Sequence, residues 1–303
     1  MKESIRRWLG LAALPAVLLM FGLSSQAHAV AYDCDDAQSE PTGSIEITHS
    51  GNCTISQSLT AQGDITINVT GGTIDTQGLT STEGKIVING QGNGTFNGEI
   101  KAENNVEIEI SSNGTLDAKA KITSVKGDVF LESIDKDVMT KAIDSGQAVE
   151  VLAGIQDGTS AGKIIIDGDI RANTEEIPLV PQVGTGTNVL LRAQETIKTK
   201  SVSTNGTSVA GSASCGGIQI DANLHPFNNT LFTIGDDTPN GVNGVLDTRT
   251  ATGGGTDPFY RACGIAVTNG VSASQAGLKV NDFASIQTAN TASLGDIVIL
   301  DAQ

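Results

Sequence analysis

The chain has 303 residues, of which only 3% are aromatic and 36 are glycine, and its formal net charge is −16. So few aromatic side chains argue against a large globular core of the usual kind. A surface this acidic repels nucleic acid and anionic lipid, so neither is expected as a partner.

Residues 1–29 are expected to be a cleavable signal peptide. Basic residues precede an apolar run over residues 8–23, and Ala27-His28-Ala29 has the small-x-small pattern that signal peptidases cut. A retained anchor is the alternative, but the run is short for spanning about 30 Å of hydrocarbon, and Pro15 interrupts it. We therefore expect an exported, extracellular or cell-surface protein whose mature chain begins at Val30 and has no stable membrane span.

A short phrase recurs from residue 43 onward: Gly or Asn, a polar residue, then apolar residues at alternate positions. Its first apolar residues are Ile45, Ile65, Ile86, Val106 and Val129. Two further phrases lie between these, the first ending at Ile55, Ile74, Phe96 and Leu116, the second marked by Leu59, Leu79, Ile100 and Ala120. Three period-two segments in each repeat of about twenty residues predict a coiled β-solenoid, because each coil must bury one apolar row per face against its neighbours.

The predicted fold class is all-β: a right-handed parallel β-helix with three short strands per coil, its hand following from the strong preference of parallel crossovers. A single domain over residues 30–303 is expected, with regular coils over 43–204 and less regular, loop-bearing coils over 205–303. One inward column is predicted to contain Ile45, Ile65, Ile86, Val106, Val129, Val149, Ile164 and Val189. Glu46, Thr66, Glu107 and Glu150 are expected to point outward.

All four cysteines lie in the part expected to be exported, on the oxidising side. They allow three pairings. Thiolate metal sites would need nearby histidines or Cys-x-x-Cys spacing, and only His49 and His225 follow residue 29, so disulfides are favoured and neither a metal nor a cofactor is expected. We expect Cys34 to pair with Cys53 and to cap the first coil, which would otherwise expose its apolar cross-section.

Cys215 and Cys263 precede similar strand phrases and are expected to occupy matching corners of two coils. Two coils of separation would put their Cα atoms about 9.6 Å apart, beyond the roughly 7 Å that a disulfide allows. The hypothesis is therefore that residues 218–262 make one coil with a long loop, and that a Cys215–Cys263 bond closes its base.

Residues 133–146 interrupt the repeat and favour a helix. Ser133 can cap its start, Gly146 can end it, and apolar residues including Val138 and Met139 fall on one face. This helix is predicted to lie against the side of the solenoid or to span a corner, with Val138 and Met139 covered; a polar loop is the alternative. From Val149 to Val189 the chain advances 40 residues, which predicts two coils and an insertion at Glu175–Thr187.

The block formed by Ile143-Asp144-Ser145-Gly146, then Ala148-Val149-Glu150-Val151, then Gly162-Lys163-Ile164-Ile165-Ile166-Asp167-Gly168-Asp169-Ile170 resembles a segment common in filamentous-haemagglutinin-type surface proteins. The resemblance covers roughly residues 43–204. It implies a right-handed parallel β-helix and a role as an adhesin or surface fibre.

Aromatic and polar residues gather in one excursion of the irregular part, which makes it the candidate ligand-recognition loop, since loops on a rigid scaffold commonly carry function. The candidate residues are His225, Phe227, Phe232, Asp236, Asp237, Phe259, Tyr260 and Arg261. The partners expected are a cell-surface glycan, a host or matrix protein, or further copies of the chain joined end to end.

A polysaccharide-binding or polysaccharide-cleaving enzyme, a lyase or a glycoside hydrolase, is the alternative function. Gly235-Asp236-Asp237 is similar to the paired aspartates of polygalacturonase-like hydrolases, which need two carboxylates about the glycosidic bond. The His-Gly and Arg-x-Lys signatures of that group are missing, and a lone Gly-Asp-Asp is typical of a turn. No catalytic residue is therefore assigned, and a structural or adhesin-like protein is favoured over an enzyme.

Overall fold

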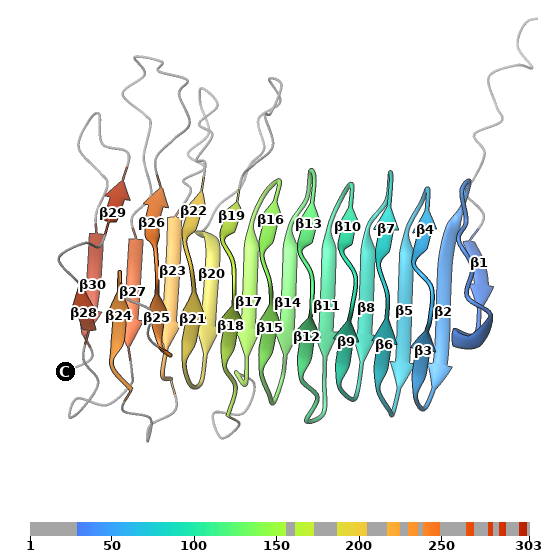
Figure 1. Cartoon of the computed structure of the whole chain (residues 1–303), viewed down its shortest axis with the longest axis horizontal. Helices are drawn as coiled ribbons and strands as arrows, with labels where there is room; N and C mark the ends of the chain where they lie inside the picture. The colour runs from blue at the N-terminus through green and yellow to red at the C-terminus, as the bar shows by residue number, and fades with distance from the viewer. Residues whose placement is uncertain are drawn as a thin grey trace, which may run out of the picture.

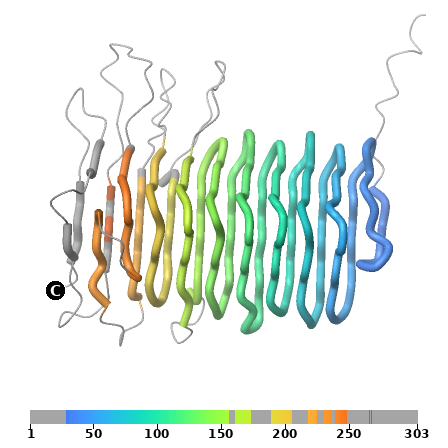
Figure 2. Tube along the Cα trace, viewed as in Figure 1, coloured from blue at the N-terminus to red at the C-terminus, as the bar shows by residue number. Residues whose placement is uncertain are grey.

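The computed structural model describes residues 29–155, 161–172, 187–204, 217–224, 230–235, 239–248, 265–269, 278–280, 285–288 and 297–301. The chain winds into a rod of stacked coils, with the first coils at one end and the last coils at the other (Figure 1). The Cα trace follows successive turns lying side by side along the long axis (Figure 2). The expected signal peptide lies outside the described residues, except for Ala29.

Three parallel sheets run the length of the rod, and from β2 to β22 each coil contributes one strand to each sheet. In spatial order, sheet A contains β1 (Ala29–Tyr32), β2 (Ser44–Ser50), β5 (Ile65–Thr70), β8 (Ile86–Gly90), β11 (Val106–Ile110), β14 (Val129–Ser133), β17 (Val149–Ala153), β20 (Thr187–Ala193), β23 (Gly217–Ala222), β27 (Ile265–Asn269) and β30 (Ile297–Asp301). Sheet B contains β4 (Leu59–Ala61), β7 (Leu79–Ser81), β10 (Ile100–Ala102), β13 (Ile122–Ser124), β16 (Ile143–Ser145), β19 (Ile170–Ala172), β22 (Val202–Thr204), β26 (Val245–Thr248) and β29 (Ser285–Thr288). Sheet C contains β3 (Cys53–Ile55), β6 (Ile74–Thr76), β9 (Gly94–Phe96), β12 (Leu116–Ala118), β15 (Val138–Thr140), β18 (Ile164–Ile166), β21 (Ile197–Thr199), β25 (Gly241–Val242), β24 (Phe232–Ile234) and β28 (Leu278–Val280). The predicted right-handed parallel β-helix is confirmed.

The inward column of sheet A is confirmed over most of its length. Its residues pair strand to strand and are at most 1% exposed: Ile45, Ile65, Ile86, Val106, Val129, Val149 and Val189. The placement of Ile164 in this column is wrong, because Ile164 lies in β18 of sheet C and pairs with Val138. Since β17 pairs directly with β20, residues 149–189 make one coil and not two, with the extra length in the connections. Of the predicted insertion, only Thr187 is described.

The other two rows are shifted relative to the sequence phrases. Gly94, and not Phe96, is aligned with Ile74 and Leu116, and Ile122, and not Ala120, pairs with Ile100. Packing explains the first shift, because a Cβ on Gly94 would lie 3.0 Å from the ring of Phe96. The ring of Phe96 thus takes up space that a side chain at position 94 would need.

The predicted helix over residues 133–146 is wrong. This segment contains the end of β14, then β15 and β16, and in the described residues the only helix is the 3-10 helix η1 (Cys34–Asp36). Val138 and Ile143 are fully buried, as predicted for Val138, but Met139 lies on the outer side of β15 and is partly exposed. A stack of Val138 on Leu116 and of Ile143 on Ile122 therefore outweighs the local helical pattern.

Glycine fits the corners between sheets because successive coils approach each other there through their backbones. At the corner between sheets A and C, a Cβ on Gly92 would lie 2.7 Å from the carbonyl carbon of Gly72 and closer still to its oxygen. At the same corner of the preceding coil, Gly71 has a φ of +70°, and a Cβ added to it would meet no atom within 4 Å. Glycine is thus favoured at this corner for two different reasons: at Gly92 because another backbone is close, and at Gly71 because φ is positive.

We expect Gly92→Ala to lower the free energy of unfolding by about 2 to 3 kcal/mol, because two backbones must separate to admit the methyl group. Gly71→Asn is the control: it fills open space, and Asn tolerates a left-handed backbone, so a change within about 1 kcal/mol is expected. Chemical denaturation of both variants measures the difference. Equal effects at the two positions would refute the close-approach argument.

The N-terminal end is closed as predicted. Cys34 and Cys53 form a disulfide with a Cα–Cα distance of 5.4 Å, and both side chains are buried against the first coil. Asp33 caps η1 through the amide nitrogen of Cys34 at 2.8 Å, and its carboxylate also contacts Nδ1 of His49 at 2.5 Å. The hydrogen bond from His49, followed by that from Cys34, lowers the pKa of the Asp33 carboxyl.

In the loop-bearing region, β23 pairs directly with β27, from Ile218 to Ile265. The intervening residues therefore make a single coil, as the hypothesis required, and contribute β24, β25 and β26. Within this coil β24 and β25 pair with each other in parallel, which adds one strand to sheet C. Cys215 and Cys263 themselves lie outside the described residues, so their pairing stays a prediction.

Candidate recognition surface

The predicted recognition loop lies almost entirely outside the described residues. His225, Phe227, Asp236, Asp237, Phe259, Tyr260 and Arg261 all belong to segments that are not described. Phe232 is the exception: it lies in β24 with 0% exposure, so its side chain is part of the core and is not available to a ligand. The described surface of the regular coils provides a different candidate.

The N-terminal cap brings three ligand-type atoms together, from Asp33, Cys34 and His49, all within 4.8 Å. The sulfur of Cys34 is committed to the disulfide with Cys53, so this cluster has no thiolate to offer a metal. Its contacts instead hold η1 against the first coil.

On the outer face of sheet B, one carboxylate is paired with two cations. Asp144 on β16 accepts two hydrogen bonds from the guanidinium of Arg171 on β19, at 2.7 and 2.6 Å, and also pairs with Lys121. Burial alone would raise the pKa of the Asp144 carboxyl, but the hydrogen bonds from Arg171 and Lys121 outweigh it, and the pKa lies below the ordinary value. On and beside sheet C, further ion pairs join Asp117 to Lys119 and Asp167 to Lys141.

On the outer face of sheet A, acids that have no ion-pair partner among the described residues lie beside apolar side chains. We call this the acidic–apolar face, and it comprises Glu109, Phe130, Glu132, Glu150, Leu152 and Leu190. Phe130, Glu150 and Leu190 are aligned across β14, β17 and β20, while Glu109, Glu132 and Leu152 are aligned across β11, β14 and β17. Parallel pairing places neighbours within each row about 4.8 Å apart.

Glu132 stands at the centre of this face. It lies between Glu109 and Leu152 in its row, with Phe130 two residues earlier on the same strand. Desolvation by burial, followed by the negative charges of Glu109 and Glu150, raises the pKa of its carboxyl. Because the folded state favours the protonated form, ionised Glu132 opposes folding above this raised pKa. The penalty decreases as the pH falls below the raised pKa and is gone below the ordinary pKa of glutamate.

Glu132→Gln is therefore expected to stabilise the protein at neutral pH, by about 0.5 kcal/mol, since the group is partly solvated and like charges on adjacent strands cost this order of energy. The gain should vanish at a pH below the ordinary pKa of glutamate. Urea unfolding at both pH values measures it. Glu46→Gln is the matched control: Glu46 is also outward on sheet A, but its cross-strand neighbours are Ala31 and Thr66. An equal gain from both variants would contradict the assignment.

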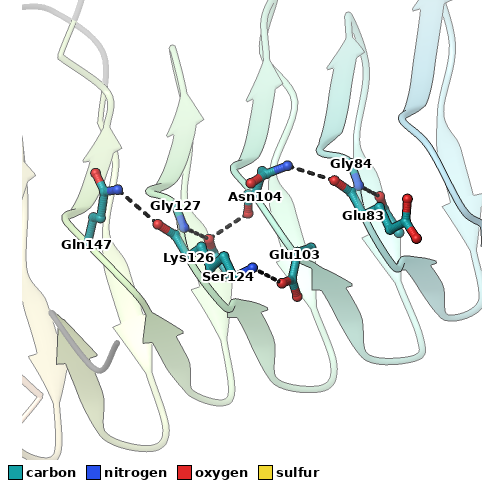
Figure 3. Close-up of polar contacts among 9 residues, drawn as sticks. Glu83, Gly84, Glu103, Asn104, Ser124, Lys126, Gly127 and Gln147 are labelled. Carbon is teal, nitrogen blue, oxygen red and sulfur yellow. Dashed lines mark hydrogen bonds and ion pairs between the residues drawn. The ribbon is translucent and has the colours of Figure 1, made fainter. Parts of the chain in front are cut away.

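A polar ridge runs beside sheet A where the chain turns from sheet B (Figure 3). Buried Ser124 donates to the carbonyl oxygen of Asn104 at 2.6 Å and accepts from the amide of Gly127 at 3.0 Å. On the surface, the Asn104 side chain donates to the carbonyl of Glu83 at 2.8 Å, and Gln147 to that of Lys126 at 2.9 Å. The bond between Ser124 and Gly127 lies within one corner, whereas the other three join one coil to the next and fix the strands of sheet A at the corner where each coil enters it.

Comparison of the chain with protein-family models, with curated proteins and with solved structures finds no match in any of the three. Among the described residues, no helix has the length and apolar character needed to cross a membrane.

The acidic–apolar face was missed by the sequence reasoning. Its signal was present, since Phe130 and Leu190 are apolar residues at the outward position that Glu46 and Thr66 occupy in the first coils. Recognising it required the register, because Phe130, Glu150 and Leu190 are far apart in the chain.

Proposed function

We propose that this chain is an exported, extracellular or cell-surface structural or adhesin-like protein, a rigid rod that presents its faces to other molecules. The observation that carries the proposal is the continuous buried column of sheet A, closed at its first coil by a disulfide. A solenoid of this kind is stiff because every coil packs on its neighbours, and its length yields extended surfaces suited to binding.

Two features of the sequence support the same function. The signal-peptide pattern over residues 1–29 supports export, and export agrees with a disulfide, which persists in an oxidising compartment. The resemblance of residues 43–204 to filamentous-haemagglutinin-type surface proteins supports an adhesin-like role. Fold alone does not determine function, so a polysaccharide-cleaving enzyme is the competing outcome of the test.

The test uses the full chain as secreted, applied to a glycan array and to immobilised matrix proteins. In parallel, the protein is incubated with a panel of acidic polysaccharides while new reducing ends and unsaturated products are measured. Binding to a glycan or matrix protein without cleavage supports the adhesin-like function. Bond cleavage would overturn it in favour of an enzyme, and binding to none of the targets would also count against it.

A further inference from the structure

We propose that the acidic–apolar face of sheet A binds a basic, amphipathic segment of another polypeptide. This deepens the proposed function, on which it rests, by assigning the surface and the chemistry of its partner. The face spans four adjacent strands, β11, β14, β17 and β20, in the part of the rod where the coils are stacked in unbroken register.

The charge on this face lacks compensation within the described part of the chain. None of Glu109, Glu132 and Glu150 forms an ion pair or hydrogen bond there, whereas on sheet B the carboxylate of Asp144 has two cationic partners. The arginine on the next strand, Arg192, lies beside Leu152 but bonds to Asp221 at 3.0 Å. Three carboxylates thus remain for cations from a partner.

The three carboxylates are also close to one another. Glu109 and Glu132 are directly aligned on neighbouring strands, and Glu150 lies on the strand that follows, in the other row. Like charges in such positions repel, which agrees with the raised pKa of Glu132. A lysine or arginine placed between them would remove this repulsion as well as gain its own attraction, so the face favours a cationic partner.

Apolar side chains define the rest of the partner. Phe130, Leu152 and Leu190 are all partly exposed, and each lies directly beside a glutamate of the face. A uniformly charged ligand would leave these side chains in contact with water, whereas a segment that alternates basic and apolar residues can cover them and reach the carboxylates together. An anionic polysaccharide is disfavoured here for the same electrostatic reason.

The face is also preorganised for binding. Its strands have fully buried inner residues, including Val129, Leu131 and Val151, and coil-to-coil bonds of the polar ridge hold the chain where it enters β11, β14 and β17. Binding therefore requires little ordering of this face, so little of the free energy gained from the contacts is spent on conformational entropy.

The test measures fluorescence anisotropy of a labelled short peptide of alternating lysine and leucine, added to the full secreted chain. Two comparison peptides replace lysine by glutamate or leucine by serine. Tight binding of the lysine–leucine peptide alone supports the proposal. Equal binding of the lysine–serine peptide would overturn the proposed apolar contacts with the face. Equal binding of the glutamate–leucine peptide would overturn the proposed contacts between its carboxylates and cations of the partner.

Two triple variants separate the face from the general acidity of the protein. Glu109→Gln with Glu132→Gln and Glu150→Gln is expected to raise the Kd by about tenfold or more, since close charge pairs are lost. The control, Glu46→Gln with Glu83→Gln and Glu99→Gln, removes the same charge from other exposed positions and is expected to change the Kd by less than about twofold. Equal weakening by both triples would show attraction to net charge only and overturn the proposal.

Carbodiimide cross-linking locates the peptide independently of affinity, and peptide mapping should find its lysines joined to Glu109, Glu132 or Glu150. Cross-links confined to other acids would refute the assigned face. Because this assay contains only the purified protein and a defined peptide, its result is independent of the glycan and matrix tests. A negative result in those tests with a positive one here would reject the adhesin-like function and keep the face.

Discussion

Ile86→Asp is expected to lower the free energy of unfolding by about 5 kcal/mol or more. A loss of this size is enough to unfold the coils around this residue. Ile86 lies in β8 with 0% exposure, between Ile65 and Val106 in the inward column of sheet A. The substitution loses the burial of a large apolar side chain and places a carboxylate where its row neighbours are apolar, and each of these costs several kcal/mol.

Asn68→Asp is the matched control, since it introduces the same charge on the neighbouring strand β5 but at an outward position. Asn68 accepts a hydrogen bond from the side chain of Asn89 at 2.8 Å, and aspartate can accept it equally well. We expect its unfolding midpoint in urea to stay close to that of the wild type. If Ile86→Asp also left the midpoint unchanged, the inward column would be wrong.

The regular coils were predictable because their sequence repeats the same physical requirement. Every inward position of sheet A must be apolar, and the steps between these positions are nearly constant, so the period alone identified Ile45 to Val149 as one column. The prediction failed at Ile164 because the sequence does not distinguish strands of sheet A from strands of sheet C. A coil with two long connections has the same length as two ordinary coils, and only strand pairing separates these alternatives.

The segment after β14 shows a different limit of sequence reasoning. Its apolar residues satisfy a helical spacing as well as that of two short strands separated by a corner. The choice between them depends on the preceding coil, where Leu116 aligns with Val138 and Ile122 aligns with Ile143 when the segment forms strands. Such contacts between coils are invisible to a local pattern, and they decide the structure.

The candidate site was the least predictable part. Sequence reasoning looked for chemistry in the irregular loops, whereas the acidic–apolar face arises where ordinary outward residues from four strands come together. Glu132 and Glu150 are separated by a whole coil, yet they are close enough for the charge of Glu150 to raise the pKa of Glu132. Long-range stacking creates this proximity, and it follows from the register and not from any motif.

Removal of the N-terminal disulfide, in a variant that carries both Cys34→Ser and Cys53→Ser, is expected to lower stability by about 3 kcal/mol. The bond closes a loop with a sequence separation of 19, and loss of a cross-link of this size increases the entropy of the unfolded chain by that order. Cys53 is also fully buried and Cys34 is 3% exposed, so the two serines place hydroxyl groups among apolar side chains.

The loss should be confined to the cap and the first coils, because in a solenoid each coil contacts only its neighbours. Hydrogen exchange is the decisive measurement: amides of β2 and β3 should exchange much faster in the variant, while those of β14 and β17 keep their protection. Thr54→Ser serves as the control, since Thr54 lies on the outer side of β3 next to Cys53 and leaves the disulfide in place. Uniform loss of protection along the rod would contradict a local cap, and unchanged exchange in β2 and β3 would show that the disulfide does not hold the first coil closed.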